Sequence, residues 1–549
     1  MPLPVLECLP RQWKWQSSSL FLLLLPLLAL LAYLATKGLY TRGRLQLRMP
    51  PGPPRLPVLG NLHQMIIGSA LPHQRLRELA RRHGPVMLLQ LGTYVTPILQ
   101  HAPRITYPIR LGTVPTVVVS SAEAAREVLK THDGDCCSRP DTPGARRLSY
   151  GQKDLVCAPY NEYWREMRKL FVVELLTVRR VQATCCAREA QVDKLIDRLS
   201  SCGGKQVFLE DHIFGLMDGI IGAVALGNIS GAEQLAHKKR FRHVIEEAVD
   251  VLAGFSFEGY FPNAAGRLVD HITGIVSRRE RVFRELDAFF ETIIEQHLDD
   301  SSRPTASSSS SSGLVNALIG LMKDNGRQGS ALSLGRDHIK ALLSDTFIAG
   351  VDTSSVTMVW AMAELIRRPA IMRKVQVEIR ATVGADKARV QHDDMPKLRY
   401  LKMVVKETLR LHPALPLVPR ETLRHIKISG YDVPAKTRLL VNAWAIGRDP
   451  ATWDNPDEFD PDRFEAGKDI DFNGTHFELV PFGAGRRMCP GMAMAVATVE
   501  FTLANLLYCF DWKLPRGMKD MSMEEAGVLT VNKKTPLVLV PTWYNKCHC

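Results

Sequence analysis

The sequence lacks the cysteine patterns that mark secreted and zinc-binding proteins. Its eleven cysteines are spaced irregularly, with adjacent pairs at residues 136–137 and 185–186. Such spacing predicts no disulfide framework. The Cys-His-Cys tail at residues 547–549 lacks the second pair of ligands that a structural zinc site needs. These absences favour a reducing compartment.

The sequence also lacks a basic segment interleaved with aromatic residues. The net charge is +13, but Lys and Arg are spread along the chain, whereas nucleic-acid-binding proteins gather them in one patch or stripe. We therefore predict no nucleic-acid partner. An anionic membrane surface or an acidic protein partner fits the dispersed charge better.

Charge is absent from one long stretch near the N-terminus. Residues 17–35 are rich in leucine and include no charged side chain. As a helix of about 1.5 Å per residue, this run is roughly 28 Å long, enough to cross the core of a bilayer. A cleaved signal peptide is the alternative, but no small-residue cleavage site precedes the basic stretch that follows. More basic residues follow the run than precede it, so we predict a membrane anchor over residues 1–36 with the body in the cytosol.

A hinge and one large folded body follow the predicted anchor. Residues 37–57 are first basic and then proline-rich, and consecutive prolines stiffen the backbone into an extended strut. The charged fraction of 23% and the hydrophobic fraction of 46% are those of an ordinary globular protein. We assign residues 58–549 to this body. A low-complexity Ser-rich segment at residues 301–313 predicts a linker between helices.

The strongest candidate for chemistry is the segment P-F-G-A-G-R-R-M-C-P-G at residues 481–491. Its glycines let the backbone turn tightly and approach a large flat group, and a thiolate needs nearby positive charge or a metal. Cys489, ahead of an apolar helix, is a candidate axial ligand of haem iron; an inert buried cysteine is the alternative. The ligand is favoured because the frame F-x-x-G-x-R-x-C-x-G is matched at Phe482, Gly485, Arg487, Cys489 and Gly491. This frame resembles the haem-binding loop of the cytochromes P-450.

A second motif interrupts the long apolar helix predicted over residues 336–368. At residues 349–354, Gly350 weakens the helix, and Asp352 and Thr353 place an acid and a hydroxyl in its interior. Burying such groups is costly unless they are used. A helix kink with a buried Asp is the simpler interpretation without Cys489. With it, the segment resembles the family's oxygen-binding motif, which implies that Asp352 and Thr353 relay protons.

Two further motifs resemble haem contacts of the same family. Trp164 and Arg168 are four residues apart and so share a helix face. Such a pair alone is more often packing plus a solvated charge. The resemblance implies that this pair holds one haem propionate and that Arg420 holds the other.

A charged triad is implied in the same way. Glu407 and Arg410 are three residues apart on a predicted helix and can pair, although an exposed pair contributes little to stability. In the family, this pair is joined by an arginine from an F-x-P-x-R-F segment, which here is Arg463. The resemblance implies a structural role near the haem.

One segment departs from the family pattern. Residues 85–92 and 113–121 read as strands, and in the family such strands join directly as a hairpin. Here Leu-Gly-Thr occurs at residues 91–93 and again at 111–113, and residues 94–110 between the copies have no clear period. We interpret residues 94–110 as an insertion that forms a loop at a sheet edge.

The resemblance covers residues 50–541 and implies a fold. That fold is mainly α with small β-sheets, the cytochrome P-450 fold, preceded by one transmembrane helix. It also implies haem b as cofactor, electrons from NADPH through NADPH–cytochrome P-450 reductase, and a single-pass location in the endoplasmic reticulum membrane. Residues 58–549 are then the catalytic domain.

Residues 120–133, 162–171, 261–268 and 476–487 resemble plant members of the family that convert an aldoxime through a nitrile to an α-hydroxynitrile in cyanogenic glucoside synthesis. We expect a small aromatic substrate in an apolar pocket lined by Phe347, Ile348, Ala349, Gly350, Leu415, Val418, Val528 and Leu529. Oxidation of another plant metabolite (a terpenoid, phenylpropanoid or indole) is an alternative. So is an oxygen-independent rearrangement enzyme, although such enzymes typically lack the Asp-Thr pair. A product inactivated by the insertion is the third alternative.

Overall fold

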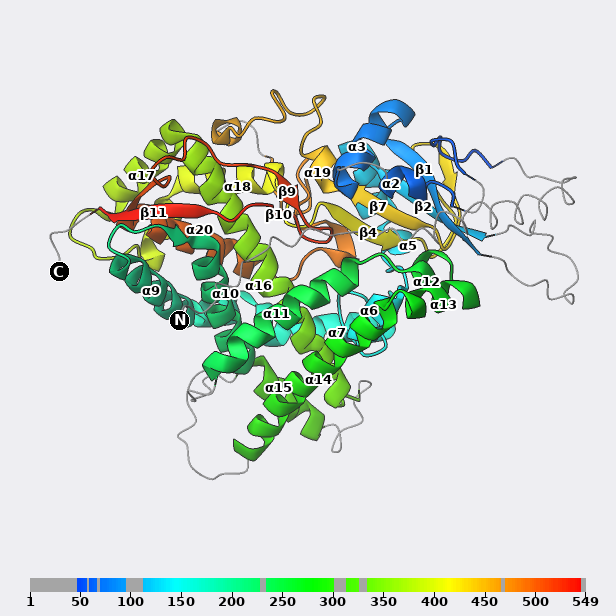
Figure 1. The fold of residues 1–549 in the computed structure, drawn as a ribbon, viewed down its shortest axis with the longest axis horizontal. Coiled ribbons are helices and arrows are strands. Elements are labelled where there is room, and N and C mark those ends of the chain that lie inside the picture. Colours follow the sequence, from blue (N-terminus) through cyan, green and yellow to red (C-terminus); the bar gives the residue numbers. More distant parts are fainter. Residues whose placement is uncertain are drawn as a thin grey trace, which may run out of the picture.

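The computed structural model describes residues 47–56, 59–66, 70–94, 112–227, 234–300, 313–324, 333–465 and 470–544. The predicted anchor at residues 1–36 lies outside these ranges. All but one residue of the suspected insertion (94–110) and of the Ser-rich segment (301–313) also lie outside them. Helices dominate the described part and its sheets are small, as the sequence predicts (Figure 1).

Local signals in the sequence set where the helices begin and end. The Asn161 side chain accepts a hydrogen bond from the Trp164 N–H at 2.8 Å and so caps the start of α7. Helix α16 ends before Arg368, because a residue that precedes proline disfavours helical backbone. The helices are α2 (Leu62–Ile66), α3 (Pro72–His83), α4 (Ala122–Arg126), α5 (Asp133–Cys136), α6 (Pro143–Leu148), α7 (Glu162–Phe171), α8 (Val178–Ala183), α9 (Cys185–Ser201), α10 (Leu209–Leu226), α11 (Gln234–Ala253), α12 (Phe257–Tyr260), α13 (Ala264–Ile272), α14 (Ile275–Asp300), α15 (Leu314–Asp324), α16 (Arg336–Arg367), α17 (Pro369–Val383), α18 (Arg399–Leu411), α19 (Ala443–Ile446) and α20 (Met492–Cys509).

The largest sheet has the strand order β1-β2-β7-β4, with β1 (Val86–Tyr94), β2 (Gly112–Val119), β7 (Arg438–Asn442) and β4 (Leu417–Glu421). Strands β1 and β2 pair antiparallel from Val86–Val119 to Leu91–Val114, so the two predicted strands pair although residues 94–110 separate them in sequence. Strand β2 runs parallel to β7. The smaller sheets pair β3 (Val207–Phe208) and β8 (Phe510–Lys513) with β11 (Val538–Trp543), β5 (Ile426–Ile428) with β6 (Tyr431–Val433), and β9 (Glu525–Ala526) with β10 (Asn532–Lys533).

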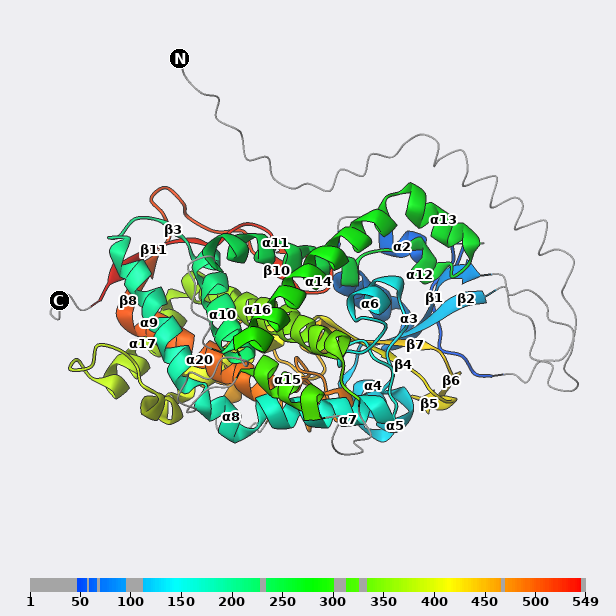
Figure 2. The same cartoon turned by 90° about the horizontal axis from the view of Figure 1, so that it is seen from below.

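Helix α16 forms the centre of the helical part. It packs against α10, α14, α18 and α20, and both views show α10 and α20 beside it, with the four-stranded sheet at the other end of the molecule (Figures 1 and 2). Gly350 lies at the contact with α10, where an added Cβ would lie 2.6 Å from the Ile221 side chain. Within the described residues, only α20 is long and apolar enough to span a membrane, and most of that helix is buried in the core.

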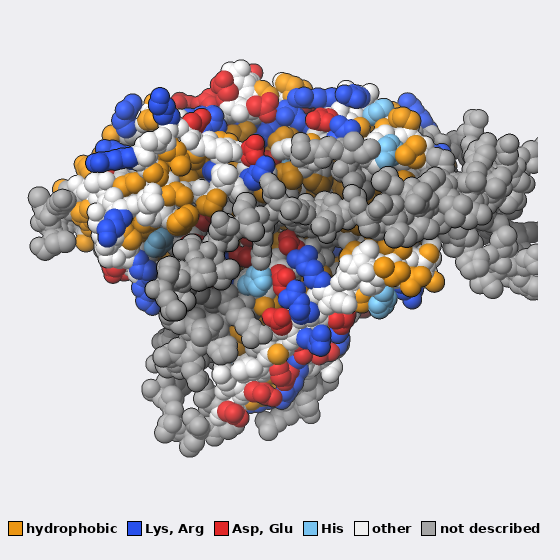
Figure 3. All heavy atoms as spheres, viewed as in Figure 1, with side chains coloured by type: hydrophobic (Ala, Val, Ile, Leu, Met, Phe, Trp, Pro, Cys, Tyr) orange, Lys and Arg blue, Asp and Glu red, His pale blue; other side chains and the backbone are white. Residues whose placement is uncertain are grey.

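The surface over α11 and α14 carries charges of both signs side by side (Figure 3). Arg281 of α14 pairs with Glu247 of α11 at 2.9 Å, and Arg278 pairs with Asp250 at 3.0 Å. Exposed pairs of this kind each contribute about 1 kcal/mol or less. The two helices are therefore held mainly by their apolar residues, such as the buried Val244 and Val282.

Candidate active site

Residues 481–491 form a closed loop directly before α20. The N–H of Cys489 donates to the Phe482 carbonyl at 3.0 Å. Gly485 has a φ of 69°, and an added Cβ would lie 2.4 Å from the Leu129 carbonyl oxygen. Only glycine fits this turn, so the loop backbone holds Cys489 in one place.

The thiol of Cys489 is accessible and is also desolvated by the surrounding protein. This desolvation raises the pKa of the thiol. The backbone N–H groups of Gly491 and Met492 and the charge of Arg168 act in the opposite direction. The effect of burial on the pKa exceeds the combined effect of these three groups. A stable thiolate here therefore needs a further cationic centre such as a metal ion.

One face of α16 is also accessible, although other helices surround it. Ala349 is exposed and Gly350 and Thr353 are half-buried, while most other residues of α16 are buried. The Thr353 hydroxyl donates to the Ala349 carbonyl one turn earlier, at 2.7 Å. Because α20 packs on α16, the loop that holds Cys489 leads directly into a helix that contacts α16.

Asp352 is a buried acid with spare hydrogen-bonding capacity. Its Oδ2 atom has no hydrogen-bond partner among the described residues. Burial raises the pKa of Asp352 to about 6, against the effect of a hydrogen bond to the Thr530 side chain. An acid with this pKa exchanges protons readily near neutral pH, so Asp352 and the neighbouring Thr353 hydroxyl form a pair able to move a proton.

The raised pKa of Asp352 predicts a pH-dependent stability. Relative to the ordinary value of 3.8, the folded chain holds this proton more tightly than the unfolded chain. The contribution of Asp352 to stability is therefore largest at low pH and is lost as the pH rises from about 4 to about 6. As the pH rises from 4.5 to 7, the free energy of unfolding of Asp352→Asn should increase by about 2 kcal/mol relative to that of the parent. Urea unfolding at the two pH values measures this difference.

A matched control lies on the same helix. The pKa of Asp337 is lowered by a hydrogen bond from Lys153, so the contribution of this carboxylate is already present above its ordinary pKa and is lost only at lower pH. Asp337→Asn should therefore be less stable than the parent by nearly the same free energy of unfolding at pH 4.5 and at pH 7. If the free energy of unfolding of Asp352→Asn differed from that of the parent by the same amount at pH 4.5 and at pH 7, the raised pKa would be wrong.

Four arginines converge beside the loop without a carboxylate partner among the described residues; they are Arg139, Arg168, Arg420 and Arg487. Backbone carbonyls hold them instead: Arg168 donates to Met488 O at 2.6 Å, and Arg420 donates to Ala484 O at 3.4 Å. Desolvation lowers the pKa of all four, that of Arg487 to about 9, and the nearby guanidinium charges lower several of them further. Such a cluster calls for an anion with more than one negative charge.

Trp164 packs against the arginine cluster. Its indole N–H donates to the Leu155 carbonyl at 2.9 Å, and the Arg487 guanidinium lies 4.0 Å from the centre of its ring. Arg487 also donates to Cys137 O at 2.8 Å and to Ala158 O at 2.6 Å. Of the predicted Trp164–Arg168 pair, Arg168 contacts the cysteine loop, through the Met488 carbonyl. The indole N–H of Trp164 points instead to the Leu155 carbonyl.

The structure brings the predicted triad together. Arg410 donates to both carboxylate oxygens of Glu407 at 2.7 Å, and Arg463 donates to the same carboxylate at 3.0 Å. The side chains of Glu407 and Arg410 are fully buried. Remaining donors of Arg410 reach the carbonyls of Pro456 and Glu458 at 2.7 and 2.8 Å, so the triad fixes the loop after α19.

The predicted pocket residues of α16 point in different directions. Ala349 and Gly350 lie on the accessible face, and Ile348 is half-buried against the main core. Phe347 is buried against Phe290 of α14, with ring centres 6.3 Å apart. Phe347 and Ala349 are two positions apart, which is about 200° around the helix, so their side chains point in different directions.

The other predicted pocket residues come from two loops. Val418 is buried beside the cysteine loop, 3.8 Å from the position of a Cβ at Gly483. Leu415 and Leu529 are half-buried, and Val528 is 48% exposed at the tip between β9 and β10.

Comparison with known proteins decides the family. The model of the family described as Cytochrome P-450 matches residues 50–106 and 99–539, two segments that overlap within the suspected insertion. A curated 4-hydroxyphenylacetaldehyde oxime monooxygenase of Sorghum bicolor is 56% identical over 97% of this chain and 96% of its own length. The chain belongs to the cytochrome P-450 family.

Other relatives agree with this assignment. A 2-methylbutanal oxime monooxygenase of Manihot esculenta is 42% identical over 98% of this chain and 99% of its own length. A solved zebra fish cytochrome P-450 with progesterone has the same fold, with a TM-score of 0.70 at 23% identity over 86% of this chain and 100% of its own. As a cytochrome P-450 the chain is a monooxygenase, and the family implies a haem-iron cofactor and electrons from a reductase.

The described residues of this cytochrome P-450 fit a haem. A haem carries two carboxylates, which match the unpaired charges of the arginine cluster. Its iron takes a thiolate as axial ligand in this family, and the accessible Cys489 thiol is the group next to Arg168. The accessible face around Ala349 provides space on the α16 side.

Sequence reasoning missed Arg139 and Thr530. The Arg139 Nε donates to Val156 O at 2.9 Å, and its Nη1 donates to Pro419 O. In addition to burial, the charge of Arg139 lowers the pKa of both Arg420 and Arg487. Thr530 contributes the hydrogen bond to Asp352. Both contacts join parts of the chain that are distant in sequence, and neither residue belongs to a motif.

Proposed function

We propose that Cys489 is the thiolate ligand of the iron in haem b and that the arginine cluster binds its two propionates. The carrying observation is an accessible thiol on a closed glycine loop beside four arginines that lack carboxylate partners within the described ranges, of which Arg420 and Arg487 are buried. When bound, the haem supplies oxygen activation with electrons from NADPH through NADPH–cytochrome P-450 reductase. Phe482, Gly485 and Gly491 shape the loop.

We propose that Asp352 and Thr353 deliver protons for this chemistry. The unpartnered Oδ2 of Asp352 is available to take a proton from water. The Thr353 hydroxyl lies on the accessible face, where rotation away from the Ala349 carbonyl frees it to donate. These two side chains therefore lead from a buried acid to the accessible face of α16.

Thr353→Ala should uncouple the enzyme. Haem content and substrate binding should stay unchanged, because the hydroxyl bonds only to its own helix. Product formed per NADPH should fall about tenfold or more, and peroxide should rise, since a positioned proton donor contributes about 10² or more to a rate. Thr353→Ser keeps the hydroxyl and should retain most of the coupling. Unchanged coupling in Thr353→Ala would remove this residue from the relay.

We propose that the substrate is an aromatic aldoxime, 4-hydroxyphenylacetaldehyde oxime, converted through the nitrile to the α-hydroxynitrile. The two curated relatives named above both oxidise oximes, and one of them is 56% identical to this chain. The candidate pocket walls are aliphatic at Ala349, Leu415 and Leu529, which suits a flat ring held by burial and dispersion.

A reconstituted assay tests this proposal. The chain, a plant cytochrome P-450 reductase and NADPH are incubated with the aldoxime, the nitrile, and a terpenoid, a phenylpropanoid and an indole. We expect a substrate-induced spectral shift and α-hydroxynitrile only with the first two. Turnover of another class with no shift from any aldoxime would sink the substrate proposal and leave the monooxygenase assignment intact.

We also propose the layout of the chain: a membrane anchor at residues 1–36, a hinge at residues 37–57 and a catalytic domain at residues 58–549 that faces the cytosol from the endoplasmic reticulum. The apolar run, the basic flank and the proline-rich strut support it. A chain lacking residues 1–36 that still sediments fully with membranes after expression would contradict the anchor.

Removing residues 94–110 should leave a folded enzyme. Strands β1 and β2 keep their pairing on either side of the segment, and a longer hairpin loop costs only about 0.6 kcal/mol per doubling of its length. Haem content per protein, measured by pyridine haemochrome, should be equal to that of the parent or higher. A deletion variant with less haem would show that the segment belongs to the domain.

A further inference from the structure

Glu525 is a buried carboxylate at the base of the β9–β10 hairpin. Its side chain is 6% exposed. Oε2 accepts hydrogen bonds from His73 Nε2 at 2.8 Å and Gln74 Nε2 at 2.7 Å, both from α3. Oε1 accepts from Trp444 Nε1 of α19 at 3.0 Å and lies 3.9 Å from His412 Nδ1. One carboxylate therefore joins the hairpin to two helices and to the residue that follows α18.

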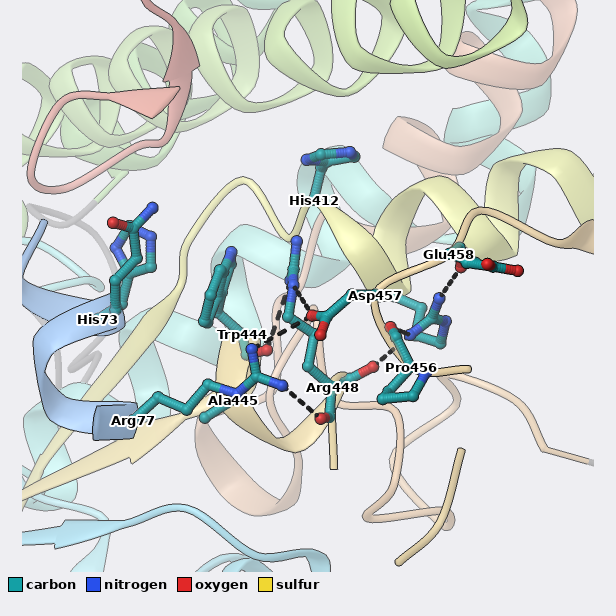
Figure 4. A network of polar contacts seen from close by, with 12 residues as sticks. His73, Arg77, His412, Trp444, Ala445, Arg448, Pro456, Asp457 and Glu458 are labelled. Carbon is teal, nitrogen blue, oxygen red and sulfur yellow. Dashed lines mark hydrogen bonds and ion pairs between the residues drawn. The ribbon is translucent and has the colours of Figure 1, made fainter. Parts of the chain in front are cut away.

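The charge of Glu525 is maintained by its surroundings. Burial alone would raise the pKa of this carboxyl, but the nearby His412 imidazole, the hydrogen bond from His73 and the charge of Arg448 hold it below its ordinary value. Figure 4 shows His73, Trp444, His412 and Arg448 in one region of the structure. The pKa of Arg448 is itself lowered to about 9 by burial, and its guanidinium lies 3.9 Å from the centre of the Trp444 ring.

The far side of the same hairpin is attached to α16. The Val531 carbonyl accepts from Trp360 Nε1 at 2.8 Å, and its N–H donates to Ala414 O at 3.0 Å. Thr530 bonds to Asp352, the proposed relay acid. The segment between the two attachments, residues 526–529, makes a tight turn at Gly527, where an added Cβ would lie 2.2 Å from Thr530 O.

A second connection links Glu525 to α16. His412 Nε2 lies 2.7 Å from Glu364 Oε1, so this imidazole stands between the carboxylates of α16 and of the hairpin. The His412 ring stacks on Trp360 with centres 4.1 Å apart. Glu525, His412 and Trp360 thus form a continuous buried path from the hairpin to the helix that carries Asp352.

We propose that Glu525 is a positioning residue that sets the orientation of the substrate by fixing residues 526–531 against α16. The proposal deepens the function proposed above, in which Leu529 borders the substrate. Glu525 has no direct part in the chemistry. Its carboxylate fixes where the pocket wall and the Thr530–Asp352 contact lie.

The chemistry of the contacts requires a carboxylate. Three N–H donors point at Glu525, from His73, Gln74 and Trp444. A carboxylate offers acceptors on both oxygens, whereas an amide offers one acceptor and turns an NH₂ group toward at least one of these donors. A buried donor left without a partner destabilises the folded structure, so one attachment of the hairpin should be released.

Glu525→Gln tests the proposal, with Glu524→Gln as its matched control. Glu524 lies on the same hairpin, but its partner Lys534 is 60% exposed and Glu524 itself is 65% exposed, so its loss should change little. In both variants haem content should match the parent. Only Glu525→Gln should speed hydrogen exchange at residues 526–531 in the substrate-free enzyme. It should also weaken binding of 4-hydroxyphenylacetaldehyde oxime about tenfold and raise the release of peroxide.

A milder variant keeps the test decisive. Trp444→Phe removes only one donor to Glu525 and should give a smaller change in the same direction. Hydrogen exchange needs no substrate, so a failure of the aldoxime proposal leaves this readout intact. Equal exchange of residues 526–531 in the parent and in Glu525→Gln would overturn the proposal. Loss of haem in Glu525→Gln together with parent-like exchange and coupling in Trp444→Phe would overturn it as well.

Discussion

Replacing Cys489 with serine is expected to abolish the thiolate-type absorbance of the reduced carbon monoxide complex. A serine hydroxyl stays protonated near pH 7 and is a poor partner for iron, whereas a thiolate is a strong one. The backbone hydrogen bond from residue 489 to the Phe482 carbonyl does not involve the side chain, so the loop itself should survive. Haem content should fall more than about tenfold, because even a change outside the ligand set can cost 10–100-fold in metal affinity.

Cys202→Ser is the control for this substitution. Cys202 follows the end of α9, where its thiol makes only a local contact with the Arg198 carbonyl at 3.2 Å. It should retain the spectrum and the haem content of the parent. If Cys489→Ser kept the thiolate-type spectrum, another of the cysteines would have to be the ligand and the proposed site would be wrong.

Much of the fold was predictable because its signals are local. The two strands were identified by β-branched runs, and they pair on both sides of the segment that has no period. The bounds predicted for α16, residues 336–368, agree with Arg336–Arg367 because Pro369 ends the helix. The motif order placed Glu407, Arg410 and Arg463 together, and the structure shows all three in contact.

The remaining parts depend on contacts between distant residues. Arg139 joins the arginine cluster through the carbonyls of Val156 and Pro419, and no local pattern distinguishes it from a surface arginine. Glu525 meets His73 across 452 positions of sequence. Phe347 is a different case, because helical periodicity alone separates it from Ala349; the prediction for the pocket took a run of consecutive residues where the helix exposes only one face.

Glu407→Gln is expected to produce the largest loss of stability. Arg410 would keep its charge with no carboxylate partner, in a site where both side chains are fully buried. Breaking a buried ion pair by removing one partner costs about 3–5 kcal/mol. Arg463 would lose the same partner, so the loop that contains Glu458, Asp460 and Arg463 should loosen with it.

The chain offers a control with the same spacing in an exposed setting. Arg75 and Glu78 on α3 are also three residues apart with a distance of 2.7 Å, but their side chains are 28% and 49% exposed. Glu78→Gln should therefore change the free energy of unfolding by about 0.5 kcal/mol or less. Urea unfolding of the two variants and the parent, followed by circular dichroism, measures the difference. The two pairs differ in burial and in the second arginine that Glu407 holds. Similar losses in both variants would show that the triad contributes no more than a surface pair.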